Sequence, residues 1–248
     1  MALSPLPAAD SPLYEQVRAR LIEGISAGEW KAGEALPSET QLARGFGVAI
    51  GTIRKAVDSL VAERALVRRQ GKGTYVTAHE GSRLHFHFFH IVGRDGSKVA
   101  PEVRTIAFRR DRADREAAEA LGIAPSDKVI RIRNLLSLEG SPRVVDDITI
   151  AAELFPGLSE KTFVARNNTI YQLYQSRFGI NVLRTDERLR AVLADASLAT
   201  LLEVQPGAPL LEIRRVALTF RDRPVELRLS RVDTARHHYH NTLGKEIA

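Results

Sequence analysis

The sequence predicts an α+β protein of two domains, a small helical domain that ends in a β-hairpin and a larger domain with a mainly antiparallel sheet. Residues 36–76 hold two short helical patterns, joined by a glycine-containing turn and followed by a basic hairpin. Residues 78–83 form a short polar segment, which is typical of a linker. Over residues 84–248 strand and helix patterns alternate, and one unit of them occurs twice.

The first domain is expected at residues 12–77, after a proline-rich flexible tail at 1–11. Apolar residues at steps of four from Leu13 to Ile25 predict a first helix, which ends at Gly28. Three helices and a hairpin make a domain of about the smallest size that can bury its own core.

A capping box marks the start of the second helix. Ser38 and Gln41 are spaced so that each side chain can accept a hydrogen bond from an unpaired backbone N–H, which predicts a helix from Ser38 to Gly45 or Gly47. A third helix opens near Ala49. Its apolar residues recur at helical spacing and predict a core stripe: Ile53, Ala56, Val57, Leu60 and Val61.

A basic β-hairpin, the wing, completes the domain. Residues 66–69 and 74–76 read as strands, and the glycines between them permit a tight turn. No acidic residue occurs from 64 to 76, a segment that holds Arg64, Arg68, Arg69 and Lys72. A helix-turn-helix followed by such a hairpin has the parts that enter duplex DNA, so these cations are expected to meet phosphates rather than only solvent.

Residues 12–77 resemble the DNA-binding domain of the GntR family of bacterial transcription regulators. The motifs that carry the resemblance are Pro12-Leu13-Tyr14, Leu36-Pro37-Ser38-Glu39, Phe46-Gly47-Val48, Thr52-Ile53-Arg54-Lys55-Ala56 and Gln70-Gly71-Lys72-Gly73-Thr74-Tyr75-Val76. The resemblance implies that Thr52 contacts phosphate, that Arg54 reaches phosphate or a base edge, and that the wing tip approaches the minor groove. The positions it assigns to DNA are Ser38, Thr40, Ala49, Ile50, Gly51, Thr52, Arg54, Lys55, Arg69, Gly71, Lys72 and Gly73.

Two of these positions depart from the family pattern. The family often has Arg where Thr40 stands and usually has Arg where Ile50 stands. Loss of an Arg that grips guanine removes discrimination of about 1–3 kcal/mol at that base pair, so the operator sequence cannot be transferred from relatives. Ile50 either touches a thymine methyl or merely packs.

Composition narrows the class of protein. The chain has no cysteine, which excludes disulfides and thiolate chemistry. Its 44% apolar content suffices for real cores, and its net charge of +6 agrees with nucleic-acid binding without deciding it. No stretch approaches the roughly 18 apolar residues of a membrane span, and the N-terminal residues lack the features of a signal peptide. A soluble cytoplasmic protein without a membrane partner is expected.

The second domain contains a weak internal repeat. Residues 114–132 match residues 195–213, and each copy continues into a hairpin. Two units of helix, strand and strand predict four antiparallel strands side by side, covered by helices. Between the copies, residues 169–178 read as a helix and residues 181–191 as a strand.

The region from residue 84 onward resembles the UTRA effector domain, which has a chorismate-lyase-like fold and marks the HutC subfamily. The motifs are Phe108, Leu121-Gly122, Ile130 to Arg133, Gly140 with Pro142, Leu154-Phe155-Pro156-Gly157-Leu158, Ile170-Tyr171, Leu201-Leu202 and Pro224-Val225-Glu226. The resemblance implies that residues 84–248 bind a small metabolite and form a homodimer that controls the spacing of the two DNA-binding domains.

Candidate ligand-binding residues follow from strand alternation and from the resemblance. Arg131 and Arg133 share one face of a predicted strand and suit a carboxylate or phosphate, although an exposed face with surface ion pairs is the alternative. The resemblance places ligand contacts at Arg131, Arg133, Asp146, Thr169 and Tyr171. Glu187 is a further candidate, or else a buried and paired structural carboxylate.

Six of the seven histidines fall in two clusters, His85, His87 and His90, then His237, His238 and His240. Spacing alone is weak evidence for a metal, so no metal and no cofactor are assigned.

These patterns predict a DNA-binding transcription regulator, a repressor, whose affinity for double-stranded operator DNA responds to a small acidic or phosphorylated effector. The alternative is a lyase-like enzyme with an accessory DNA-binding domain, which lacks an assembled nucleophile, base and orienting group. The effector, the operator, the regulated genes and the direction of the ligand's effect do not follow from the sequence.

Overall fold

The structure, a computed structural model, describes residues 11–63, 65–78, 88–166 and 169–241. The chain divides into two compact units, residues 1–79 with 168–183, and residues 80–167 with 184–248. Segment 168–183 therefore groups with the first unit, although the sequence places it in the second domain. The domain bounds taken from the sequence stay predictions.

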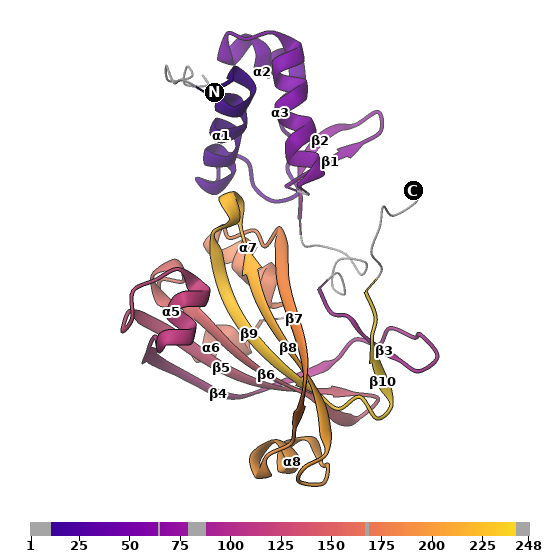
Figure 1. Cartoon of the computed structure of the whole chain (residues 1–248). Coiled ribbons are helices and arrows are strands. Elements are labelled where there is room, and N and C mark those ends of the chain that lie inside the picture. Colours follow the sequence, from indigo (N-terminus) through magenta and orange to yellow (C-terminus); the bar gives the residue numbers. More distant parts are fainter. Residues whose placement is uncertain (1–10, 64, 79–87, 167–168, 242–248) are drawn as a thin grey trace. The chain divides into compact units, whose positions relative to one another are not determined.

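The first unit contains the helix-turn-helix and the wing that the sequence predicts (Figure 1). Its elements are α1 (Leu13–Ser26), α2 (Glu39–Phe46), α3 (Ile50–Ala62), β1 (Leu66–Arg69), β2 (Gly73–Val76) and α7 (Ile170–Phe178). Strands β1 and β2 pair antiparallel, as a hairpin must. Core residues from each of the three N-terminal helices are almost completely buried, among them Leu21, Leu42 and Leu60.

The predicted capping box is confirmed. The Ser38 Oγ accepts a hydrogen bond from the Gln41 N–H at 3.2 Å, and the Gln41 Oε1 accepts one from the Ser38 N–H at 2.8 Å. Gly47 ends α2 with a φ of 67°, a left-handed conformation that glycine adopts without strain. Local sequence signals therefore set both ends of α2, which sets the turn before α3.

In the described part of the second unit, six strands form an antiparallel sheet in the order β4-β5-β6-β9-β8-β7, and β3 pairs with β10 in a separate ribbon. The strands are β3 (Ile91–Gly93), β4 (Glu102–Arg112), β5 (Lys128–Leu138), β6 (Ser141–Ala151), β7 (Arg184–Leu193), β8 (Pro209–Leu218), β9 (Pro224–Val232) and β10 (His237–Tyr239). The helical elements are α5 (Arg115–Leu121), η1 (Ala152–Leu154), α6 (Glu160–Val164), α8 (Ala196–Leu202) and η2 (Phe220–Asp222).

The sheet order confirms the repeat and extends it. Hairpins β5–β6 and β8–β9 meet through the pairing of β6 with β9, so the four predicted strands are neighbours. An edge strand precedes the helix of each copy. The strand predicted at residues 181–191 is β7, which precedes α8, and the structure adds β4 before α5. Asp114 and Asp195 are equivalent N-caps, which accept the N–H groups of Ala117 and Leu198, both at 2.8 Å.

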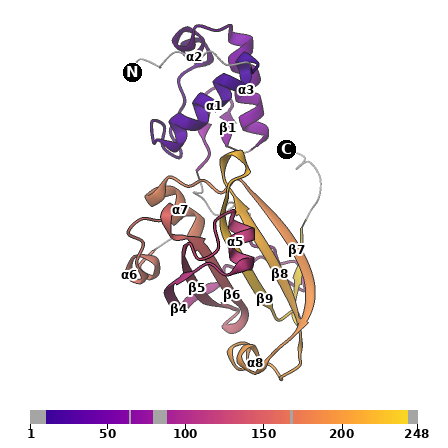
Figure 2. The same ribbon diagram turned by 60° about the vertical axis from the view of Figure 1, so that its left-hand side comes forward.

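The two sides of this sheet carry different elements. Helices α5 and α8 pack on one side, called here the helix face, against apolar residues that include Val129 for α5 and Val145 for α8. Figures 1 and 2 show the two helices near different ends of the strands. Ile91 of β3 packs on the other side, called the β3 face, with Leu136 and Val232. Because successive side chains of a strand alternate, neighbouring residues face different surroundings.

Replacing Asp114 by Ala is expected to lower the free energy of unfolding by about 1 kcal/mol, because the start of α5 loses its cap. The hydrogen bond from the Ala117 N–H lowers the pKa of the Asp114 carboxyl. This stabilisation is therefore present above the unfolded-state pKa of about 3.9, and it disappears as the pH falls through the folded-state pKa.

Urea unfolding at neutral and acid pH tests this expectation. Glu119→Ala, at an exposed position on the same helix, serves as the control and should change stability by less than about 0.5 kcal/mol. An effect of Asp114→Ala that stays constant below pH 3 would contradict the capping role.

Candidate functional site

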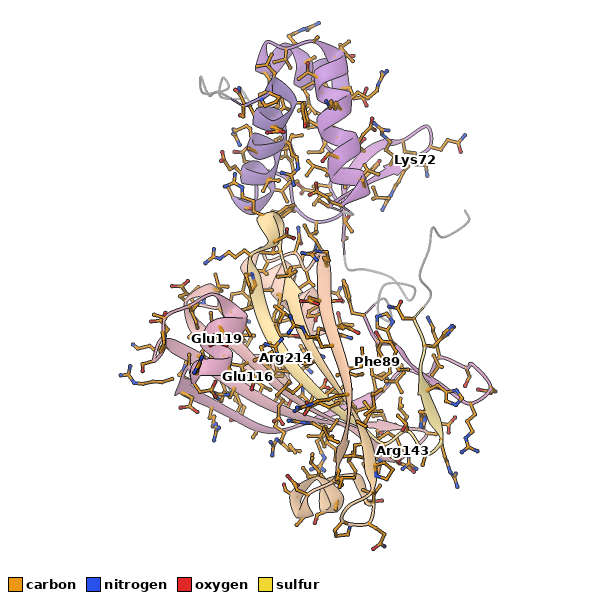
Figure 3. All side chains as sticks on the ribbon, viewed as in Figure 1. Lys72, Phe89, Glu116, Glu119, Arg143 and Arg214 are labelled. Atoms are coloured by element: carbon orange, nitrogen blue, oxygen red, sulfur yellow. The ribbon has the colours of Figure 1, made fainter. Side chains whose placement is uncertain are left out.

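The residues predicted to contact DNA all lie at the surface of the first unit. They occupy the start of α2, the start of α3 and the wing, and none of them is buried. Lys72 projects outward from the wing tip (Figure 3). The Ile50 side chain is 43% exposed, which favours availability for a thymine methyl over packing in the core.

Glu39, which is not among the positions predicted to contact DNA, links the parts of this surface. Its carboxylate lies 3.1 Å from the Arg54 Nε on α3 and 3.1 Å from the Arg68 Nη2 on β1. Arg68 also lies 2.6 Å from Asp58. The local signal was an acidic residue in the first turn of α2, a common feature of helix starts that carries no functional meaning by itself.

Two cations of this surface lie against aromatic rings. The Lys55 Nζ is 3.9 Å from the centre of the Tyr14 ring, and the Arg69 guanidinium is 4.4 Å from that of Tyr75. Such contacts are worth about 0.5–1 kcal/mol at exposed sites. They orient both side chains before any ligand arrives.

The four predicted effector contacts of the second unit lie on two different faces of its sheet. Arg131 and Arg133 lie on the helix face, whereas Asp146 and Glu187 lie on the β3 face. Thr169 and Tyr171 belong to α7 in the first unit. The sequence did not show this division, because the parity of each strand decides the face, and parity across strands depends on a register that one strand's sequence does not show. That these residues contact an effector stays a prediction.

On the helix face, both predicted arginines have carboxylate partners. The Arg133 Nε and Nη2 donate to the two Asp147 oxygens at 2.6 and 3.0 Å. The Arg131 Nη2 donates to Asp114 at 2.7 Å, and Asp111 lies 3.3 Å from the Arg131 Nε. The surface ion pairs that formed the alternative are therefore present, and the same arginines border a cleft of about 580 Å³.

The β3 face holds a group of buried and half-buried polar residues, called the polar cluster: Thr105, Asn134, Asp146, Glu226, Arg228 and Ser230. Arg228 donates to both Glu226 oxygens at 2.9 and 3.1 Å and to Asp146 at 3.0 Å. The Asp146 carboxylate also accepts from the Ser230 hydroxyl at 2.5 Å. Three ionised groups are thereby held within the sheet, each with charged partners.

Asn134 is the member of the polar cluster with unfinished hydrogen bonding. Its Oδ1 accepts from the Thr105 hydroxyl at 2.9 Å, while its Nδ2 is buried and has no partner. The side chain is completely buried. A sequence signal existed, since Asn134 follows the apolar Ile130 and Ile132 at the same alternating positions of its strand, but it did not show that the amide nitrogen would lack a partner.

Glu187 is paired, as its structural alternative supposed. Its carboxylate accepts from the Arg215 Nε at 2.6 Å and from the Tyr239 hydroxyl. Burial, aided by this hydrogen bond, raises the pKa of Tyr239 above its ordinary value.

On α7, Thr169 is the N-cap and accepts the Gln172 N–H at 3.2 Å, and the Tyr171 side chain is buried. The N–H groups at the start of this helix are therefore partly satisfied by its own cap.

His85 and His87 lie outside the described residues. His90 packs against the Tyr239 ring with 5.2 Å between ring centres, and His237 is buried, which lowers its pKa. The described ranges contain no group of three or more potential metal ligands. Nor do they contain a helix with the length and apolar character needed to cross a membrane.

Comparison with known proteins identifies both halves of the chain. Residues 13–76 match "Bacterial regulatory proteins, gntR family", and residues 96–238 match the UTRA domain. The probable fructoselysine utilization operon transcriptional repressor of Escherichia coli K12 is 31% identical over 217 residues, which cover 87% of this chain and 88% of that protein. The histidine utilization repressor of Pseudomonas putida is 28% identical over 210 residues, 83% of this chain and 82% of that protein.

A solved structure supports the same relationship. The ligand-binding domain of a putative GntR-family regulator from Bordetella bronchiseptica is 37% identical, with a TM-score of 0.61 over 64% of this chain and 98% of that one. The predicted HutC-type combination of domains is confirmed, and the relatives are regulators rather than the lyase-like enzyme kept as the alternative. The chain belongs to the gntR family of bacterial regulatory proteins and is a transcription regulator with a UTRA domain.

Proposed function

We propose that the protein is a homodimeric repressor that binds a pseudo-palindromic operator and responds to a small polar metabolite held by the polar cluster. The family supports repression, because the Escherichia coli and Pseudomonas putida relatives are named as repressors. The proposal that the polar cluster holds the metabolite rests on the buried Asn134 Nδ2, which has no hydrogen-bond partner. A buried donor without a partner costs about 1–3 kcal/mol, which a ligand with an acceptor oxygen would recover.

The charges of the polar cluster indicate the class of ligand. Arg228 is bound by two carboxylates, and the neighbouring Arg215 is bound by Glu187. Three carboxylates therefore accompany two arginines on this face, which favours hydroxyl, carbonyl or amino groups over a phosphate. The acidic class predicted from the sequence depended on Arg131 and Arg133, which lie on the opposite face.

The printed names of the relatives agree with this class. They refer to the utilization of fructoselysine and of histidine, both small polar compounds, in those organisms. We therefore infer a catabolic metabolite as the effector of this protein. No individual compound follows from the residues.

The response requires a difference in binding energy. A ligand changes operator affinity only if it binds one arrangement of the dimer more tightly than another. Each 1.4 kcal/mol of difference between the two binding free energies changes the population ratio of the two arrangements about tenfold. The DNA titration described below determines whether the ligand releases or promotes binding.

The effector site is tested with Asn134→Leu, which removes the unpaired amide without changing charge. An operator would be selected from random duplexes, and ligands would be found by thermal shift of the full chain among sugars, amino acids and their conjugates. Asn134→Leu should lose the ligand's effect on operator affinity and keep operator binding without ligand. Arg133→Gln, on the other face, should keep both. The reverse pattern would place the effector on the helix face and refute the proposal.

The DNA interface is tested with Arg54→Ala, which removes a cation from the exposed face of α3. Operator affinity at fixed salt should fall by more than about 1 kcal/mol, because each lost contact typically costs that much. Arg44→Ala provides the control, since it removes an equal charge from α2 outside the predicted contacts. Equal effects of the two changes in a fluorescence-anisotropy titration would show general electrostatics rather than a specific contact.

A further inference from the structure

Besides the polar cluster, the second unit contains the cleft on the helix face. Its volume of about 580 Å³ falls within the range of about 300–1,000 Å³ found for small-molecule sites. Strands β4, β5, β6 and β9 and the start of α8 provide its walls. It lies on the face opposite the polar cluster, so the effector proposed above does not occupy it.

A ladder of alternating charges crosses the helix face, and three of its residues, Arg133, Asp147 and Arg231, line the cleft. Five neighbouring strands, from β7 to β5 across the sheet, each contribute one residue: Arg190, Glu212, Arg231, Asp147 and Arg133. Successive partners lie 2.6, 2.9, 2.7 and 2.6 Å apart. All four carboxylate oxygens of Glu212 and Asp147 accept hydrogen bonds within the ladder. The carboxylates are thus saturated by arginines of the protein itself.

Three of the arginines that border the cleft, Arg109, Arg133 and Arg231, have donor groups left over. Arg133 uses its Nε and Nη2, and Arg231 uses its Nε and Nη1, which leaves one terminal nitrogen of each without a hydrogen bond among the described residues. The Arg109 side chain is 68% exposed, and its ion pair with Asp111 is long, at 3.5 Å. Asp195, also in the cleft wall, uses one oxygen to cap α8. The cleft therefore offers more donors than acceptors.

We propose that this cleft binds a small organic anion, whose carboxylate or phosphate group is held by Arg109, Arg133 and Arg231. Several guanidinium groups around one space match the two or three oxygens of such a group. Its carbon skeleton would lie on Ala107, Leu198 and Leu229, which also line the cleft. The proposal is independent of the effector, because the two sites share no residue.

The position of the cleft gives the bound anion a structural effect. Arg109 and Arg133 belong to the first copy of the repeat, whereas Leu198 and Arg231 belong to the second. A ligand that contacts both copies ties them together and stabilises the folded unit by mass action. Binding is therefore visible as a rise in melting temperature as well as in a direct titration.

Affinity is measured by titrating the full chain with citrate and with inorganic phosphate at constant ionic strength. Arg109→Ala and Arg133→Gln should each weaken binding about tenfold, the effect of losing roughly 1.4 kcal/mol. Arg104→Ala is the matched control, because it removes the same charge from β4 outside the cleft. Asn134→Leu should leave binding unchanged, since it alters only the other face.

The two probes distinguish a carboxylate site from a phosphate site, and binding of either one that depends on Arg133 supports the proposal. It is overturned if neither probe binds, or if Arg104→Ala weakens binding as much as Arg133→Gln does.

The site is located independently with a single thiol, because the chain has no cysteine. Ser197→Cys places the thiol in the cleft wall, and Thr200→Cys places it on an exposed part of α8 outside the cleft. Citrate or phosphate should slow alkylation of the first variant and not of the second. Equal rates with and without the anion in Ser197→Cys would refute binding at this position.

Discussion

The fold of the second unit depends on the pairing of β6 with β9. It is the only pairing between the two copies of the repeat among the described strands, and its register runs from Val144 opposite Val232 to Ile150 opposite Glu226. The helices reinforce it crosswise, because α5 packs against β9 and α8 against β6. Each copy thereby buries its helix on the strand of the other copy that lies at the junction, β9 for α5 and β6 for α8. Neither copy can therefore complete its core alone.

This register also separates the two polar systems. Asp146 and Asp147 are adjacent in sequence, yet Asp146 binds Arg228 and Ser230 on the β3 face, while Asp147 binds Arg133 and Arg231 on the helix face. A slip of one residue would exchange these surroundings and leave each carboxylate without its cations. Because a buried charge without a partner costs several kcal/mol, the two ionic networks specify the register as firmly as the apolar core does.

The parts of the fold that were predicted from sequence are those set by short-range chemistry. Ser38, Gln41 and Gly47 define α2 by themselves, and the repeat indicated which strands would be neighbours. The composition of the binding sites depends on distant residues. Arg131 and Arg133 were predicted to be a ligand pair because their own strand shows only alternation, whereas Asp114 and Asp147, which form ion pairs with them, become neighbours through folding. Asn134 was missed for the same reason, since an unpaired amide is recognised only once its surroundings are known.

In the first unit, one glutamate fixes the relative position of two arginines and leaves the surface around them exposed. Glu39 holds Arg54 of α3 and Arg68 of β1 at equal distances, so one residue relates the proposed recognition helix to the wing. Exposed ion pairs contribute at most about 1 kcal/mol, which means that a DNA phosphate can displace either arginine at small cost. With Thr40 and Ile50 at positions where the family favours Arg, fewer bidentate contacts to guanine are available. We infer that this chain recognises its operator through the combined placement of α3 and the wing more than through a dominant base contact, and Glu39 maintains that placement.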